Sequence, residues 1–141
     1  QIFESFAGAL TGENIGKVSI EPIARIIRGV RETHPSMKFI VFGRGSGGNH
    51  LRYAQETGAD AVAIDWATDP LWARTHLQPL KPVQGNLDPL AVVAGGASLD
   101  RQIDHILNAF SGGPHIFNLG HGIVPETPIA HVEQLVRRVK G

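Results

Sequence analysis

The fold is decided by residues 38–87, where three short apolar runs follow one another: KFIVF at 38–42, AVAIDW at 61–66 and PVQGNL at 82–87. Each run has the length of a buried β-strand and ends at or beside a Gly, Asp or Asn. A fourth run, HIFNL, occupies residues 115–119, and residues 1–3 are expected to form the end of a further strand. Stretches with helical periodicity separate the runs, and this alternation indicates parallel strands connected by helices.

The stretches between the runs have the features of helices with defined ends. Apolar residues recur at helical spacing over residues 21–33, where Ile26 is expected on the buried face, and again after residue 127, where Val136 is expected to face the core. Asp-Pro pairs fit the N-cap and the first helical position. The expected starts or caps of the helices are Ser19, Asn49, Asp69, Asp88, Ser98 and Thr127.

Length and composition restrict the chain to one globular domain and exclude several function classes. The 141 residues carry 13 Lys and Arg against 13 Asp and Glu, so the formal net charge is zero and no basic block indicates a nucleic-acid or anionic membrane surface. The absence of cysteine excludes disulfides, a thiolate nucleophile and Cys-based zinc sites, as is typical of a reducing compartment. No apolar run approaches the ~20 residues of a membrane helix.

About five parallel strands can form an open sheet or the second part of a (β/α)8 barrel. A complete barrel typically needs ~250 residues, so this chain is too short to close one alone. Because the first residue is Gln1 rather than Met, we expect the chain to be a piece of a longer protein.

A glycine loop (residues 43–48, GRGSGG) follows the KFIVF run. Gly43, Gly45 and Gly48 match the G-x-G-x-x-G pattern of dinucleotide-binding folds, and Asp65 lies 17 residues beyond Gly48, near the position of a ribose-binding acid. The pattern therefore allows a Rossmann-like nucleotide-binding module. It equally allows a tight βα loop, or an anion-binding nest formed by backbone N–H groups and Arg44.

The seven histidines do not show the spacing of a metal site, since no two are four residues apart on a helix. Four lie on expected helices or at their ends, where solvation explains them: His34, His76, His105 and His131. His121 is different, because it follows a strand inside NLGHGI, at the end of the sheet where βα barrels place their active sites. It is expected either to contact a ligand or to stabilise its loop.

Four strings of the sequence, in this order and spacing, resemble the C-terminal part of the uroporphyrinogen decarboxylase family. They are QIFESFAG at 1–8, GAD to DW over 58–66, QGNLDP at 84–89 and NLGHGI at 118–123. The resemblance extends over essentially all 141 residues, and the last two strings are highly specific.

The resemblance implies a TIM-barrel lyase of haem biosynthesis. Such a carboxy-lyase removes four acetate carboxyl groups of uroporphyrinogen III as CO₂ and releases coproporphyrinogen III. The pyrrole carbon is protonated, CO₂ is lost and the product is reprotonated, without a metal or organic cofactor. The family resemblance also implies a cytoplasmic homodimer. It binds a small-molecule substrate and has no nucleic-acid or membrane partner.

The same resemblance implies how the site is divided along the chain. The aspartate that holds the pyrrole N–H groups and an arginine-rich segment belong to the N-terminal part of the family, which this chain lacks. Residues 1–141 would then be the C-terminal portion of one barrel domain, inactive alone. The substrate-binding residues implied here are Phe3, Ser5 and His121, whereas Asp65 and Trp66 are assigned a structural role.

Overall fold

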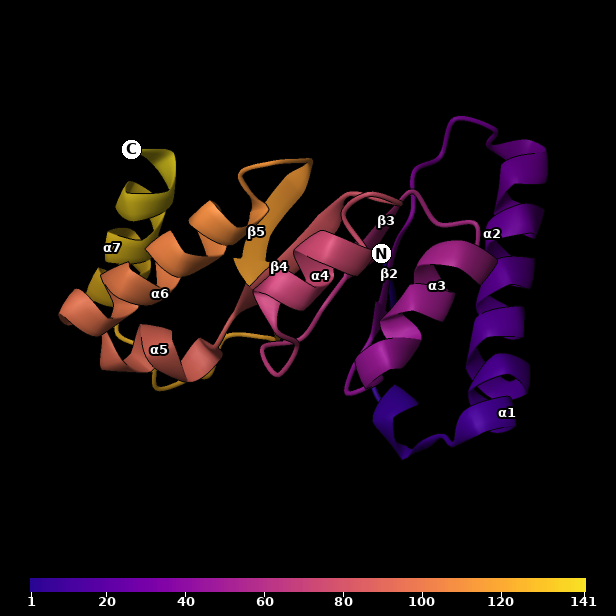
Figure 1. Cartoon of the computed structure of the whole chain (residues 1–141), viewed down its shortest axis with the longest axis horizontal. Coiled ribbons are helices and arrows are strands. Elements are labelled where there is room, and N and C mark those ends of the chain that lie inside the picture. The colour runs from indigo at the N-terminus through magenta and orange to yellow at the C-terminus, as the bar shows by residue number, and fades with distance from the viewer.

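The computed structural model describes all residues from Gln1 to Gly141 and contains one sheet of five parallel strands (Figure 1). The strands are arranged in the order of the sequence, and each pairs in parallel with the next. This confirms the expected βα alternation. The strands are β1 (Ile2–Glu4), β2 (Ile40–Gly43), β3 (Ala61–Ala63), β4 (Val83–Leu87) and β5 (His115–Leu119).

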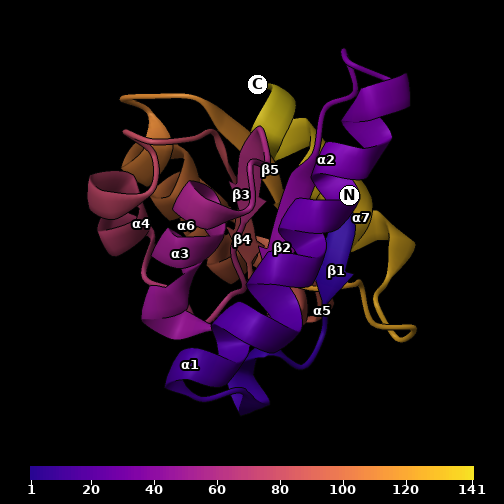
Figure 2. The same cartoon turned by 90° about the vertical axis from the view of Figure 1, so that its right-hand side faces the viewer.

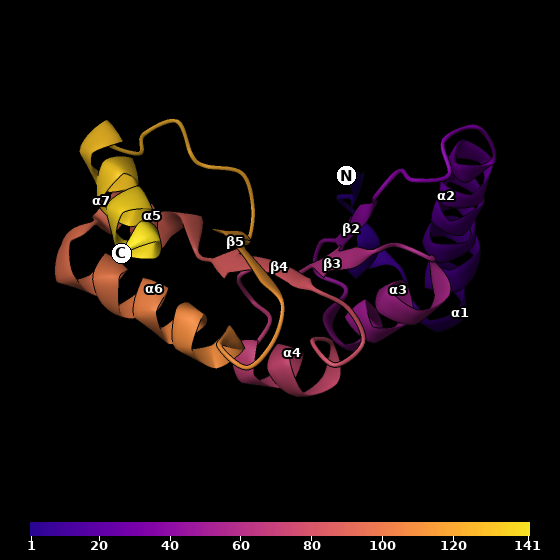
Figure 3. The same cartoon turned by 90° about the horizontal axis from the view of Figure 1, so that it is seen from above.

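Helices cover one side of this sheet and leave the other open. Seen from above, the strands form the inner layer of an arc and the helices its outer layer (Figure 3). The helices are α1 (Gly12–Ile15), α2 (Glu21–Thr33), α3 (His50–Glu56), α4 (Pro70–His76), α5 (Pro89–Ala94), α6 (Gly96–Phe110) and α7 (Ile129–Lys140). None of them is long and apolar enough to cross a membrane.

The two faces of the sheet differ as the strand period of two requires. Val41, Val62 and Val83 occupy one row of the register, point toward the helices and are fully buried. The adjacent row faces the open, concave side. It begins at Phe3, which is 65% exposed, and ends at Ile116, which is 43% exposed. Between them lie Phe42, Ala63 and Gln84, which are buried, so this face is strongly exposed only at the two edges of the sheet.

The expected start of α2 at Ser19 is wrong, because the helical path begins earlier. Residues Gly16–Ile20 form a π-helical turn that joins α1 to α2, and the two run on as one helical segment (Figure 2). Ser19 lies inside this turn, where its Oγ is 2.6 Å from the hydroxyl of Tyr53. Ile26, expected on the buried face, is 51% exposed, because the buried face of α2 is narrower than expected and consists of Ile23, Ala24 and Ile27.

Four expectations in the C-terminal half also need correction. Helix α6 starts at Gly96 behind the N-cap Gly95, so Ser98 lies inside the first turn and caps nothing. Helix α7 starts after Pro128 without a side-chain cap, and Val136 is 41% exposed. His131 is not simply solvated, since its Nδ1 lies 2.9 Å from the carbonyl oxygen of Val92 at the end of α5.

Candidate functional site

The carboxyl ends of the strands carry the polar side chains that the sequence singles out. Each strand there is followed by a loop and then a helix, and Asp69 and Asp88 cap two of those helices. The Asp69 carboxylate accepts the N–H groups of Leu71 and Trp72, and Asp88 accepts that of Leu90. The expected capping roles are thus confirmed.

Phe3 and Ser5 lie at the β1 edge of the sheet. Phe3 is the middle residue of β1, and Ser5 is the first residue after that strand, in a turn. The ring of Phe3 meets that of Phe42 edge-on, with centroids 6.0 Å apart. Ser5 is exposed. Both side chains are therefore accessible to a ligand.

His121 follows the opposite edge strand, β5, and its imidazole packs edge-on against Trp66 with ring centroids 5.7 Å apart. The guanidinium carbon of Arg44 lies 5.8 Å from the centroid of the same indole ring. The structure thus joins His121 to Trp66 and Arg44, residues from the loops after β3 and β2. It does not bring His121 into contact with Phe3 or Ser5, which lie on the far edge.

Asp65 fixes the glycine loop rather than facing the concave side. Its carboxylate accepts the N–H of Gly45 at 2.6 Å, the N–H of Ala67 at 3.1 Å and the hydroxyl of Thr68 at 3.2 Å. Asn86 continues this arrangement by donating its amide N–H to the carbonyl oxygens of Asp65 and Thr68. The ends of β2, β3 and β4 are thereby held together, in agreement with a structural role for Asp65.

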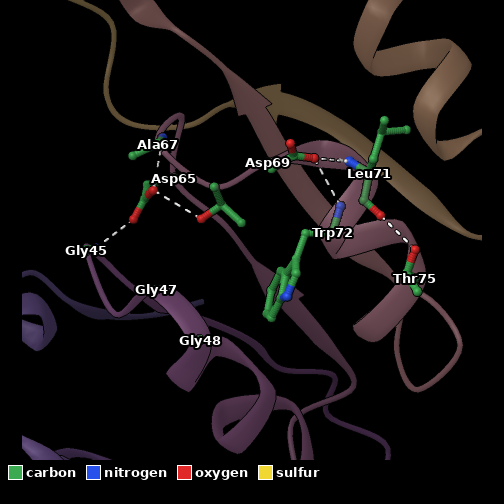
Figure 4. Close-up of a pocket in the computed structure, with 10 residues that line it drawn as sticks. Gly45, Gly47, Gly48, Asp65, Ala67, Asp69, Leu71, Trp72 and Thr75 are labelled. Carbon is green, nitrogen blue, oxygen red and sulfur yellow. Dashed lines mark hydrogen bonds between the residues drawn. The ribbon is translucent and has the colours of Figure 1, made fainter.

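The glycine loop borders a pocket of about 740 Å³ between it and α4 (Figure 4). Trp72 points from α4 toward Gly47 and Gly48, and Asp65 and Asp69 lie at the rim. A ribose-binding acid needs free carboxylate oxygens, but those of Asp65 already accept three donors. The pocket therefore lacks the acid that the dinucleotide interpretation assigned.

A buried histidine lies beneath the same loop. His50 is completely buried, neither ring nitrogen has a hydrogen-bond partner, and its Nε2 is 3.9 Å from Oδ2 of Asp65. Burial lowers the pKa of His50 to about 4, against the opposing attraction of Asp65, so the ring is neutral at pH 7. His50 was not among the residues that the sequence motifs single out, although its spacing to Tyr53 and Ala54 places it on the buried face of α3.

The strand order bears on the choice between the fold classes left open by the sequence. A nucleotide-binding open sheet reverses its strand order at a switch point, where the ligand binds. The order β1-β2-β3-β4-β5 contains no reversal, as in the wall of a barrel.

Comparison with known proteins decides the family. The family described as "Uroporphyrinogen decarboxylase (URO-D)" matches residues 1–141, the whole chain. The chain belongs to the uroporphyrinogen decarboxylase family. Proteins called uroporphyrinogen decarboxylase from Sphingopyxis alaskensis and Rhizorhabdus wittichii are 54% and 50% identical to it over 141 residues. One from a Chelativorans species is 49% identical over 140 residues, 99% of the chain.

The chain spans about 41% of the length of these relatives. Membership of the uroporphyrinogen decarboxylase family favours the barrel interpretation over the Rossmann-like module. It also explains the glycine loop without a nucleotide, because the loop is a tight βα connection in which Gly43 stands against the ring of Tyr53. A Cβ at Gly43 would lie 2.4 Å from that ring.

Proposed function

We propose that this chain forms one side of the substrate pocket of a uroporphyrinogen decarboxylase, which converts uroporphyrinogen III to coproporphyrinogen III. The match of the family over the whole chain carries the proposal. In it, residues 1–141 are part of a single barrel domain, and the remaining strands close against the edges of β1 and β5. Closure would bring Phe3 and Ser5 toward the same cavity as His121.

The proposed roles follow from the chemistry of uroporphyrinogen, which has an apolar ring edge and eight carboxylates. Phe3 offers an exposed aromatic face for a pyrrole, while Ser5 and His121 offer donors for polar groups. The acid that protonates the pyrrole carbon before CO₂ leaves is assigned to the part of the enzyme outside this chain. The chain alone is therefore proposed to be inactive, and the whole enzyme to be a cytoplasmic homodimer.

The test uses a completed protein, in which this chain replaces the matching part of the Sphingopyxis alaskensis relative. We expect it to form coproporphyrinogen, measured by chromatography of the oxidised porphyrins, whereas residues 1–141 alone form none. Loss of one hydrogen bond to a charged group is worth about 1.5–3 kcal/mol, so Ser5→Ala and His121→Ala should each lower kcat/KM roughly tenfold to hundredfold.

His34→Ala is the matched control, because His34 is exposed at the end of α2, before β2 begins and thus away from the carboxyl ends of the strands. A folded completed protein that forms no coproporphyrinogen contradicts the proposed function. If Ser5→Ala and His121→Ala both keep the kinetics of His34→Ala, these two residues are not part of the pocket.

A further inference from the structure

Three loops of the chain bring one cation, one indole and one imidazole together at the carboxyl edge of the sheet. Arg44 directly follows β2, Trp66 lies three residues beyond β3, and His121 lies two residues beyond β5. Both Arg44 and His121 contact Trp66, at 5.8 Å and 5.7 Å from its ring. Among the residues that immediately follow the five strands, Arg44 is the only Lys or Arg.

The backbone around Arg44 is fixed while its guanidinium is not committed to another side chain. The Arg44 N–H donates to the carbonyl of Glu4 at 3.0 Å, and its carbonyl accepts the N–H of Gly8 at 2.9 Å. The guanidinium takes part in none of the ion pairs of the chain. Asp65 follows β3, two strands along the sheet from Glu4 on β1. Its carboxylate already accepts hydrogen bonds from the glycine loop and from Thr68.

Trp66 also lies where it can fix the position of the His121 side chain. The β5 end approaches the β3 end so closely that a Cβ on Gly120 would lie 2.2 Å from the backbone nitrogen of Trp66. The N–H of Gly120 also donates to the carbonyl of Leu87 at 2.8 Å. This hydrogen bond fixes the backbone next to His121. The indole of Trp66 then limits the positions that the imidazole of His121 can take.

We propose that Arg44 is a substrate-binding residue that pairs with a carboxylate of the porphyrinogen, and that Trp66 is a positioning residue that orients Arg44 and His121. The inference rests on the proposed function and adds to it a cation from this part of the chain. A guanidinium recognises a carboxylate through two parallel hydrogen bonds, and stacking on an aromatic face leaves its N–H edge free for them. The indole supplies an apolar surface beside the bound carboxylate.

The test of Arg44 compares Arg44→Gln, Arg44→Lys and the control Arg28→Gln in the completed protein. Arg28 is exposed on α2, away from the strand ends. We expect Arg44→Gln to raise KM for uroporphyrinogen about tenfold or more with kcat changed less than about threefold, since it removes a charge-assisted contact. Arg44→Lys keeps the positive charge but not the paired N–H donors of the guanidinium, so its KM should lie between those of the unmodified protein and Arg44→Gln.

The test of Trp66 is a double-mutant cycle with His121. Because Trp66 is proposed to orient both His121 and Arg44, Trp66→Leu should lower kcat/KM less in the His121→Ala background than in the unmodified protein, whereas independent roles make the two losses multiply. Trp66→Phe retains a ring against the imidazole and should preserve most of the activity, which separates positioning from a defect in folding.

Each result has a distinct meaning. Equal KM values for Arg44→Gln and Arg28→Gln overturn the role of Arg44, and multiplicative losses overturn that of Trp66. A completed protein that is folded but inactive without any substitution instead contradicts the proposed function itself.

Discussion

The carboxylate of Asp65 accepts the backbone N–H of Gly45 at 2.6 Å, so the end of β3 holds the glycine loop that follows β2. Two further donors, the N–H of Ala67 and the hydroxyl of Thr68, complete its set of partners. This one side chain therefore determines the shape of two neighbouring loops at the site.

Asp65→Ala should destabilise the completed protein by about 2–3 kcal/mol, because it removes a buried carboxylate that accepts three hydrogen bonds. Asp69→Ala is the comparison, since Asp69 is a helix cap whose loss typically costs about 1 kcal/mol. Urea unfolding of both variants gives the two free energies. A cost for Asp65→Ala no larger than that for Asp69→Ala would show that the loop does not depend on Asp65.

His50 makes stability depend on pH, with a sign fixed by burial. Its pKa is about 4 in the fold against 6.5 when exposed, so between these values the unfolded chain binds a proton that the folded chain does not. The part of the free energy of unfolding that depends on neutral His50 is therefore present above pH 6.5 and is lost as the pH falls toward 4. The total loss is about 3 kcal/mol.

His50→Leu removes the titrating group and should flatten the decline in the free energy of unfolding between pH 7 and pH 4.5. His105→Gln, which replaces an exposed histidine, should keep the decline of the unmodified protein. Denaturant titrations at the two pH values measure the difference. An unchanged slope in His50→Leu would mean that His50 is not held neutral by burial.

Gly120→Ala should separate the β5 loop from Trp66, because the added Cβ would lie 2.2 Å from the Trp66 nitrogen and backbone atoms must move. Overpacking of this kind costs about 1–3 kcal/mol. We expect kcat/KM to fall together with stability as His121 shifts. Gly122→Ala meets no atom within 4 Å and should leave the melting temperature nearly unchanged; equal melting temperatures for the two variants would contradict the close contact.

Much of the fold follows from local sequence. The five strands, the parallel pairing and the caps at Asp69 and Asp88 depend on short patterns and were predicted from them. The helical segment before α2 was not predicted, since Gly12 and Gly16 lower helix propensity and the π-helical turn is stabilised by distant contacts such as Ser19 with Tyr53.

The candidate site was predictable only in part. The position of His121 after a strand pointed to the carboxyl edge of the sheet, and this placement is correct. Its contact with Trp66 depends on the close passage of Gly120 over the end of β3, which no sequence spacing reveals. The choice of Phe3 and Ser5 came from the family resemblance alone, and it stays a prediction.

The glycine loop should not bind NAD, NADP or FAD. Its Gly45 N–H donates to Asp65 instead of a pyrophosphate, and the sequential strand order provides no switch point. Isothermal titration of the completed protein with each nucleotide should show no saturable binding at micromolar concentration. Saturable binding that Gly45→Val abolishes would restore the nucleotide interpretation.

Residues 1–141 alone should self-associate, because the sheet has two open edges and an uncovered concave face. β1 pairs only with β2 and β5 only with β4, so the outer strands present unpaired N–H and C=O groups. Phe3 and Phe6, 65% and 76% exposed, lie beside the β1 edge. Light scattering after size exclusion should therefore show a mass that rises with concentration.

The completed protein covers both edges and the concave face, so its mass should stay constant over the same concentrations. Phe6→Ser should reduce the association of the isolated chain, whereas Leu71→Ser, which removes an exposed leucine from the outer helix α4, should not. A monodisperse monomer of residues 1–141 with a sharp thermal transition, and with slow amide exchange in β1 and β5, would show that the sheet is stable without a second half to close it.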